Sequence, residues 1–385
     1  AGLPDATIAG RALGDALSLA VSGTLEDSVF SGDIAGVTDA LDLRGKGEVD
    51  LAGNRVDDFA VQGRLRDPDL LGEAVRLEGA RFTALLDGPF RDLVIEHDVS
   101  AATLTAAGTV KAQGFVQNGV ATFDGEALRV PLNVRTQRVA TGIAMLDPRL
   151  VDGVMSGALV YSGSRLEADN TQIAFPGLEA QLTLRGDVAG GVYTLAGPID
   201  VRGFALPGVG EVNANSKILL TFGSSVSWSL SADLSGVLNE ISNASIANVA
   251  GESVRFGGGL SMGGAAATQL RDVSLESERL NAQIDSRIVA GSTNITGSGR
   301  HTQYGAFTLE ADIADDGPRA TLLLANPYPA AGLSDVRVSI APDDQGFALD
   351  VAGGSLLGPF EGALGLALPA DAPTRINVDA LRVYR

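Results

Sequence analysis

The chain has 385 residues, of which 45% are apolar but only 5% aromatic, and it contains 49 glycines against 15 prolines. Its formal net charge of −19 argues against nucleic acid as a partner, because a phosphate backbone would meet a repulsive field. The absence of cysteine excludes disulfides, thiolate metal sites and a cysteine nucleophile. The composition therefore favours many short strands joined by tight turns.

The two ends of the sequence carry no recognisable targeting segment. The first residues, AGLPDATIAG, lack the basic and apolar regions of a signal peptide. No stretch reaches the roughly 18 apolar residues of a membrane helix. The last residues, RINVDALRVYR, stop within an alternating pattern. We expect residues 1–385 to be one continuous sheet segment, a fragment of a longer protein.

Apolar and polar residues alternate with a period of two along most of the chain. The run LEAQLTLRGDV at 178–188 is the clearest, and similar runs occupy 226–234, 280–290, 307–313, 336–340 and 347–351. Such strands bury one face and expose the other, since successive side chains point to opposite sides. Turn signals such as DDG and PDDQG separate the runs. The sequence therefore predicts an all-β fold of about twenty strands.

Three segments share an opening of a bulky residue, a polar residue and Asp, and lie at 90–110, 270–290 and 333–353. We expect each to form one hairpin of a long, curved, mostly antiparallel repeat sheet with an apolar concave face. Few short helices are expected. Two helical insertions are predicted near 139–153 and 235–250, the second with Ser235 as its N-cap.

The pentapeptide GLSMG at 259–263 matches the G-x-S-x-G pattern of a serine nucleophile, with Ser261 at its centre. Asp285 and His301 follow in the order of a catalytic triad. A nucleophile elbow requires a helix after the serine, but the residues here continue as an alternating strand. We therefore predict a glycine-rich hairpin or loop, and a protein that is not an enzyme.

The titratable residues suggest no metal or cofactor site. His97 and His301 are the only histidines, fewer than a typical zinc site with closely spaced ligands uses, and both are expected on a sheet face or surface. The acid pairs 315–316 and 343–344 precede Gly or Gln-Gly, where Asp stabilises turns. A carboxylate pair for glycoside cleavage depends on a separation that the sequence does not give.

A long sheet with one apolar face must hide that face by rolling up, closing, or forming a groove. A bound acyl chain of about sixteen carbons would recover about 10 kcal/mol or more in a dry groove. From the residues alone, a lipid groove and a self-packed solenoid both remain open. The predicted groove lining comprises Leu178, Leu182, Leu184, Val226, Trp228, Leu230, Leu280, Ile284, Ile288, Phe307, Leu309, Ile313, Val338, Ile340, Phe347, Leu349 and Val351.

Three stretches carry a family resemblance: LRDVSLESERLNAQIDSRIVAG, LEAQLTLRGDVAGGVYTLAG and LSDVRVSIAPDDQGFALDVAGGSLLGPFEGAL. In their Gly-terminated short strands and LxDVxL openings they resemble the β-repeat regions of bacterial AsmA-like proteins. These include the TamB and YdbH groups of the repeating β-groove, bridge-like lipid-transfer superfamily. The resemblance implies a periplasmic protein of the Gram-negative envelope that carries phospholipid acyl chains from the inner to the outer membrane. It also implies an inner-membrane anchor outside this segment and a partner protein at the outer membrane.

Other functions compete with lipid transfer. One is a secreted structural or adhesive β-solenoid without lipid cargo, which would have a filled cross-section. Another is an outer-membrane protein assembly factor. A third is a polysaccharide-acting β-helix enzyme, whose acidic residues would gather on one outer sheet face.

Overall fold

The computed structural model describes residues 8–14, 16–72, 75–106, 109–264, 266–289, 291–344, 346–367 and 375–384. The prediction of an all-β fold is confirmed. The strands belong to one antiparallel sheet of 25 strands that is not closed. The described helical elements are short: α1 (Ile8–Leu13), α2 (Ala244–Ala250) and the 3-10 turns η1 (Asp147–Arg149) and η2 (Pro329–Ala331). Within the described part, no helix combines the length and apolar character that a bilayer span requires.

The chain forms two compact units. Unit 1 contains residues 1–199 and 219–228, and unit 2 contains residues 200–218 and 229–385. The boundary passes through β13 (Val192–Leu206) and β14 (Gly210–Gly223). The other strands of unit 1 are β1 (Ser18–Glu26), β2 (Val29–Val37), β3 (Leu41–Asp50), β4 (Arg55–Leu65), β5 (Val75–Glu78), β6 (Arg81–Pro89), β7 (Leu93–Ala106), β8 (Val110–Phe123), β9 (Ala127–Ala140), β10 (Val151–Ser162), β11 (Arg165–Phe175) and β12 (Leu178–Asp187).

The strands of unit 2 follow one another with short turns. They are β15 (Ser229–Asn239), β16 (Val254–Gly263), β17 (Thr268–Glu276), β18 (Leu280–Val289), β19 (Ser292–His301), β20 (Gly305–Ala314), β21 (Gly317–Leu324), β22 (Ser334–Asp343), β23 (Gly346–Gly354), β24 (Phe360–Ala367) and β25 (Arg375–Val383).

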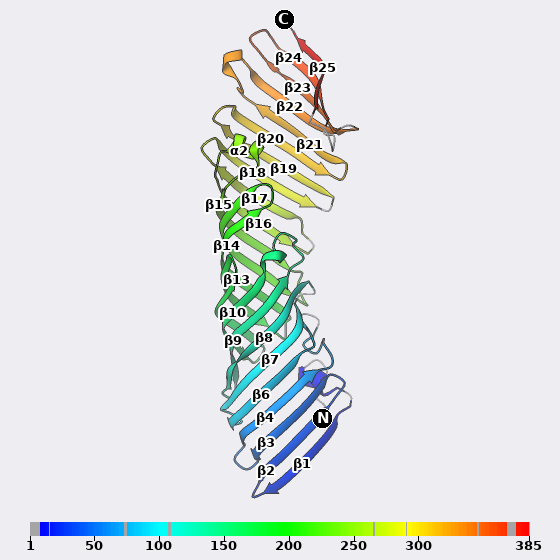
Figure 1. Cartoon of the computed structure of the whole chain (residues 1–385), viewed down its shortest axis with the longest axis vertical. Coiled ribbons are helices and arrows are strands. Elements are labelled where there is room, and N and C mark those ends of the chain that lie inside the picture. Colours follow the sequence, from blue (N-terminus) through cyan, green and yellow to red (C-terminus); the bar gives the residue numbers. More distant parts are fainter. Residues whose placement is uncertain are drawn as a thin grey trace. The chain divides into compact units, whose positions relative to one another are not determined.

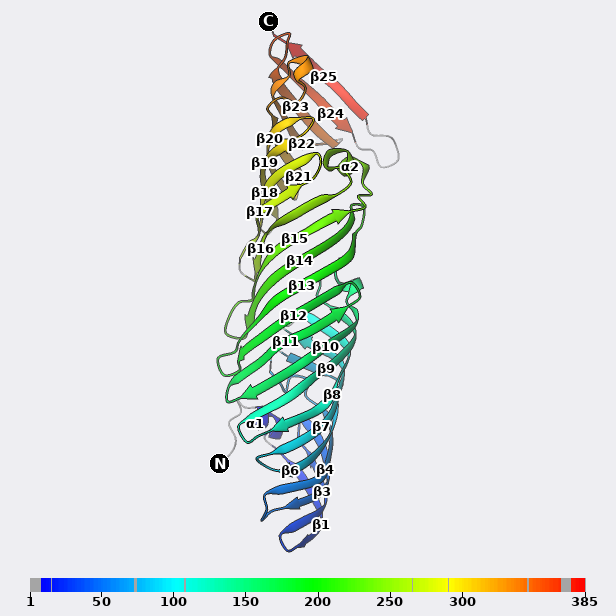
Figure 2. The same cartoon turned by 90° about the vertical axis from the view of Figure 1, so that its left-hand side faces the viewer.

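Strands pair with their sequence neighbours almost throughout. In unit 1 the spatial order is β1–β2–β3–β4–β6–β7–β8–β9–β10–β11–β12, and β5 pairs with the far end of β7. In unit 2, β15 to β25 pair in chain order. The sheet of unit 1 is curved. Strands β6–β8 face the viewer in Figure 1, whereas β10–β12 face the viewer in Figure 2, which is turned by 90°.

The protein buries few side chains for its size. Its accessible surface is 22728 Å², whereas a compact monomer of 39.3 kDa would expose about 14,000 Å². None of the described large side chains is less than 2% exposed. The small buried residues are chiefly alanines, such as Ala101, Ala121 and Ala168. The sheet is therefore one layer deep over most of its area, and its side chains shield one another within that layer.

A recurring β-bulge explains the Asp of two of the three predicted repeats, Asp272 and Asp335. Asp58, Asn170, Asp272 and Asp335 have φ between 44° and 52°. Each lies at or next to a register shift of its strand. Asp and Asn tolerate this left-handed conformation better than other non-glycine residues, so the LxDV openings mark bulges.

The predicted repeat is correct for two of its three copies. Residues 270–290 and 333–353 form the hairpins β17–β18 and β22–β23. Residues 90–110, however, run largely through the single strand β7. The expectation of a hairpin there was wrong, because the polar residues at its centre remain within the ladder with β8.

The helical insertions are shorter than expected. The region 139–153 holds only the 3-10 turn η1 between β9 and β10. In the region 235–250 the first five residues still belong to β15, and α2 begins at Ala244. Ser235 therefore is not the N-cap. Instead Oδ1 of Asn243 accepts a hydrogen bond from the Ile246 backbone N–H at 3.1 Å.

Candidate apolar binding faces

The register of unit 2 aligns apolar residues across neighbouring strands. One row crosses β18 to β24 and contains Ile284, Gly297, Leu309, Leu322, Val338, Val351 and Gly362. The next row on the same side contains Ser286, Ile295, Ala311, Ala320, Ile340, Leu349 and Leu364. Cross-strand partners share a face of the sheet. These rows therefore form one surface, called here the apolar face of unit 2.

Most of the predicted lining residues lie on this face. Register places the following residues together there: Leu230, Leu280, Ile284, Ile288, Phe307, Leu309, Ile313, Val338, Ile340, Phe347, Leu349 and Val351. The alternation thus predicted correctly which side chains share a side. Their contact with a lipid stays a prediction.

Three further predicted residues lie on the corresponding apolar face of unit 1. Leu178, Leu182 and Leu184 of β12 pair with Phe175, Thr171 and Ala168 of β11. Leu182 is only 4% exposed, so its neighbours in the sheet already cover it. The predicted lining is therefore covered at Leu182, whereas Leu178 and Leu184 remain half-buried.

Val226 and Trp228 are not in a strand, which corrects the prediction for 226–234. β15 begins only at Ser229. Just before it, the Ser225 hydroxyl donates a hydrogen bond to the Gly190 carbonyl at 2.5 Å, which ties the connection to the turn between β12 and β13. The alternation continued through this connection by chance, and Trp228 is 43% exposed.

The apolar face of unit 2 is unevenly covered. Ile288 and Ile313 are 41% and 44% exposed, and on the last strand Val378 and Leu381 are each 64% exposed. Leu309, Val338 and Leu349 are half-buried. Partly accessible apolar side chains in adjoining rows form a surface to which an apolar ligand can bind.

Aromatic rings lie over glycines of neighbouring strands, a pattern that was not predicted from the sequence. On the apolar side, a Cβ placed on Gly63 would lie 2.6 Å from Cζ of Phe82, its direct cross-strand partner. Gly236 and Phe256 repeat the arrangement in unit 2. The available signal was the frequent glycine at apolar positions of alternating runs, where a ring from the next strand replaces the missing side chain.

His97 lies on the apolar face of unit 1, in the row that also contains Val61 and Ala84. Its Nε2 is 3.2 Å from Nε2 of Gln117. The buried Gln117 side chain also donates to the Pro131 carbonyl at 2.7 Å and accepts from the Asn133 N–H at 2.8 Å. Gln117 thereby satisfies backbone groups between β8 and β9, and the histidine belongs to a structural network.

His301 is buried at the end of β19 on the apolar side of the sheet, in keeping with the predicted sheet-face position. Its Nδ1 accepts hydrogen bonds from the Gln303 and Tyr304 backbone N–H groups at 3.1 and 3.2 Å. Nδ1 is therefore unprotonated, so Nε2 carries the hydrogen and donates to the Val249 carbonyl at 2.9 Å. Arg279 Nη1 donates to the Asn248 carbonyl at 2.8 Å. Together these two side chains hold the C-terminal end of α2 against the turns of β17–β19.

The serine motif does not assemble a catalytic triad. Ser261 lies within β16, in the β16–β17 hairpin, as predicted for this glycine-rich segment, and Arg271 Nη2 donates to its hydroxyl at 3.3 Å. Asp285 accepts from the Asp272 backbone N–H at 2.8 Å. Ser261 is on the polar side of the sheet, whereas His301 pairs with Leu280 on the apolar side. Among the described residues, no group of three or more histidine, aspartate or glutamate side chains is placed to hold a metal ion.

Several acidic residues hold turns through the backbone, and the predicted acid pair Asp315–Asp316 lies in the turn between β20 and β21. The Ala127 and Glu126 N–H groups donate to Asp124 and lower its pKa. The Thr141 N–H and hydroxyl donate to Asp147 and lower its pKa in the same way. Asp316 forms a bidentate ion pair with Arg319, which lowers the pKa of the carboxyl group.

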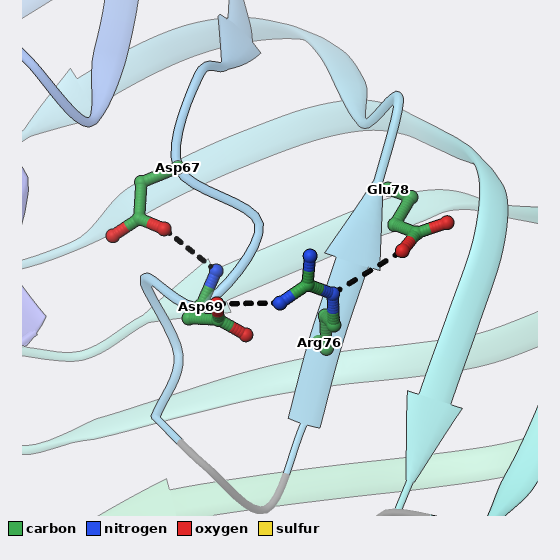
Figure 3. A network of polar contacts seen from close by, with 4 residues as sticks. All are labelled: Asp67, Asp69, Arg76 and Glu78. Carbon is green, nitrogen blue, oxygen red and sulfur yellow. Dashed lines mark hydrogen bonds and ion pairs between the residues drawn. The ribbon is translucent and has the colours of Figure 1, made fainter.

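The loop before β5 contains a polar network of its own (Figure 3). Nε of Arg76 lies 3.2 Å from Glu78, and its Nη1 lies 2.6 Å from Asp69. The hydrogen bond with Glu78, followed by the charge of Asp69, raises the pKa of Arg76. Asp67 accepts from the Asp69 N–H at 2.9 Å. The network fixes the loop, and all its members are exposed to solvent, so it contributes little to stability.

The sequence matches no protein-family model and no curated protein.

Proposed function

We propose that the apolar faces bind the acyl chains of phospholipids and that the protein transfers these lipids without chemical turnover. The observation that carries this proposal is the largely apolar row from β18 to β24, in which Leu309 and Val338 remain partly accessible. Such a row accepts a flexible hydrocarbon chain at many positions of similar energy. Each methylene group of the acyl chain that this surface removes from water contributes about 0.8 kcal/mol to binding.

The location in the cell follows from the resemblance to AsmA-like proteins. On that basis the lipid would pass between the inner and outer membranes across the periplasm, with an inner-membrane anchor outside this segment and a partner at the outer membrane. A uniform apolar row binds equally well along its length, so the row alone gives transfer no direction. The direction of transfer must come from a partner or from a lipid gradient.

A charge placed in the row tests the proposal. Ile284→Asp would put a carboxylate among half-buried apolar neighbours, where an acyl chain cannot stabilise it. We expect the purified variant to retain far less co-purifying phospholipid than the wild type in native mass spectrometry and lipid extraction.

The matched control is Gln283→Asp, because Gln283 is the preceding residue of β18 and is exposed on the other side of the sheet. In unit 1 the equivalent pair is Leu182→Asp and Thr183→Asp. Equal lipid content in both members of a pair, with both folded by circular dichroism, would exclude the assigned face as the lipid site. A wild-type protein free of lipid would contradict the proposal as a whole.

A structural β-solenoid is the competing function, and the rings over glycines in unit 1 favour it there. These rings cover part of the apolar face with the protein's own side chains. A solenoid predicts that lipid is absent and that Ile284→Asp lowers stability only. The same extraction experiment therefore separates the two functions.

A further inference from the structure

Unit 1 contains a hollow whose lining includes residues from both sides of the sheet, among them Val61 and His97 of the apolar row. It has a volume of about 1260 Å³ and crosses β1, β2, β3, β4, β6, β7 and β8. On the apolar side the ring of Phe59 covers Gly45, since a Cβ on Gly45 would lie 2.7 Å from its Cε1. Gly45 borders the hollow but Phe59 does not. The hollow therefore opens on the opposite, polar side of the sheet, and we call it the polar hollow.

The register places charges of opposite sign at two separate strands of the polar hollow. Arg44 and Lys46 come from β3, and Glu96 and Asp98 come from β7. Between these strands lie β4 and β6. They contribute Ala60, Gln62, Thr83 and Leu85 to the lining.

None of these four charged side chains forms an ion pair with another described residue, because the ion pairs of the described chain involve other groups. Arg64, in contrast, does form an ion pair. It lies on the same side of the sheet, two residues beyond Gln62, and its Nη2 is 3.2 Å from Asp42. Arg64 is thus neutralised by a neighbouring side chain, whereas the cations and anions of the polar hollow have no such partner among the described residues and remain available to a ligand.

We propose that the polar hollow binds a short zwitterionic peptide, with its carboxylate at Arg44 and Lys46 and its ammonium group at Glu96 and Asp98. Three strand spacings separate β3 from β7, which is about 14 Å. An extended peptide of about four residues has the same reach, at roughly 3.3–3.6 Å per residue. Gln62 and Thr83 can form hydrogen bonds with its amides, and Ala60 and Leu85 can contact small side chains.

The surrounding charge selects against other anions. Asp33 of β2 also borders the hollow and lies directly across from Lys46. A dianion such as phosphate at the cationic end would meet the charge of Asp33, whereas a single carboxylate balances the two cations with less repulsion. With Asp33 included, the cationic end has a net charge of +1 and the anionic end a net charge of −2, so the hollow suits a ligand with a carboxylate at one end and an ammonium group at the other.

The test is a titration of the full chain with tetra-alanine at low ionic strength, followed by calorimetry or amide chemical shifts. We expect saturable binding, with about tenfold weaker binding for each of Arg44→Gln and Asp98→Asn, the effect of losing one charge-assisted hydrogen bond. Arg64→Gln is the matched control and should bind as the wild type does. Acetylated and amidated tetra-alanine should bind at least about tenfold more weakly.

Equal affinity for the capped and free peptides, or no saturable binding, would overturn the proposal. So would equal binding by Arg44→Gln and Arg64→Gln. Phosphate that binds more tightly than tetra-alanine would assign the hollow to a different ligand and also overturn it. The lipid proposal concerns the opposite side of the sheet, so Leu182→Asp should leave peptide binding unchanged, and each proposal can fail without the other.

Discussion

The ring of Phe59 on β4 lies directly over Gly45 on β3, so that a Cβ at position 45 would come within 2.7 Å of Cε1 and 2.9 Å of Cζ. Apart from these ring atoms, the closest atom to that Cβ is the Ala60 carbonyl oxygen at 3.8 Å. Gly45 is therefore required by one side chain and not by the backbone. A glycine within an apolar run thus leaves a space that an aromatic ring from the next strand occupies.

This relation predicts a coupled pair of mutations. Gly45→Ala should destabilise the protein by about 1–3 kcal/mol, because the ring must leave its place. In a Phe59→Ala background the same change should be nearly neutral, since the space is then empty. Chemical denaturation of the wild type, both single variants and the double variant measures the coupling. Additive effects would show that Gly45 is needed for another reason.

The bulges predict a preference for glycine at the left-handed residues. Asp272 has φ 51°, so Asp272→Gly should be tolerated, whereas the β-branched Asp272→Val should cost about 1–2 kcal/mol. The comparison is made by thermal and denaturant unfolding. Val273→Ile on the same strand serves as a control for side-chain size without a change in φ. Equal stability of the Gly and Val variants would contradict the bulge assignment.

On β3, Gly47 has φ 154°, and a Cβ there would lie 2.6 Å from the Cα of Phe59 and 2.9 Å from the Asp58 carbonyl oxygen. Gly47→Ala should therefore destabilise unit 1 by more than 1 kcal/mol, on the order of a strained backbone residue. Gly36→Ala should have little effect, because the closest atom to its Cβ is Leu17 Cδ1 at 3.8 Å. Loss of stability in Gly36→Ala as large as in Gly47→Ala would refute the steric argument.

His301 predicts the attachment of α2. His301→Phe keeps the ring stacked on Tyr304, whose centroid is 4.6 Å away, but removes all three hydrogen bonds. We expect faster hydrogen exchange in residues 244–251 and little change in β20 or β21. Tyr304→Phe preserves the backbone donor to His301 and should leave α2 protected. Unchanged exchange in His301→Phe would mean that Arg279 alone holds the helix.

The turn acids predict how the loops respond to acid. The pKa of Asp147 is lowered in the folded chain, first by the Thr141 N–H and then by the Thr141 hydroxyl. A lowered folded pKa contributes stability that is present above the unfolded value of about 3.9 and is lost as the pH falls below it. The resonances of Thr141 and Gly142 should therefore stay constant from pH 7 to about pH 5 and shift only in stronger acid. A midpoint above 4 for Asp147 would contradict these hydrogen bonds.

The period-two alternation determined much of the fold without tertiary information. It identified β12, β18, β20 and β23 and assigned their apolar residues to common faces. This succeeds because a strand has only two sides, so the pattern of burial can be read directly from the order of the residues. The same rule assigned Leu309 and Val338 to one apolar face before the order of their strands was known.

The tertiary structure decided the features that depend on neighbouring strands. The sequence could not show that β15 starts after Trp228, because the bond of Ser225 to Gly190 comes from a turn 35 residues earlier. Nor could it show that residues 93–106 form one strand, that Phe59 requires Gly45, or that a hollow opens on the polar side. Local pattern gives the two sides of each strand, whereas register, bulges and curvature fix what gathers on each side, and these arise only when the strands pair.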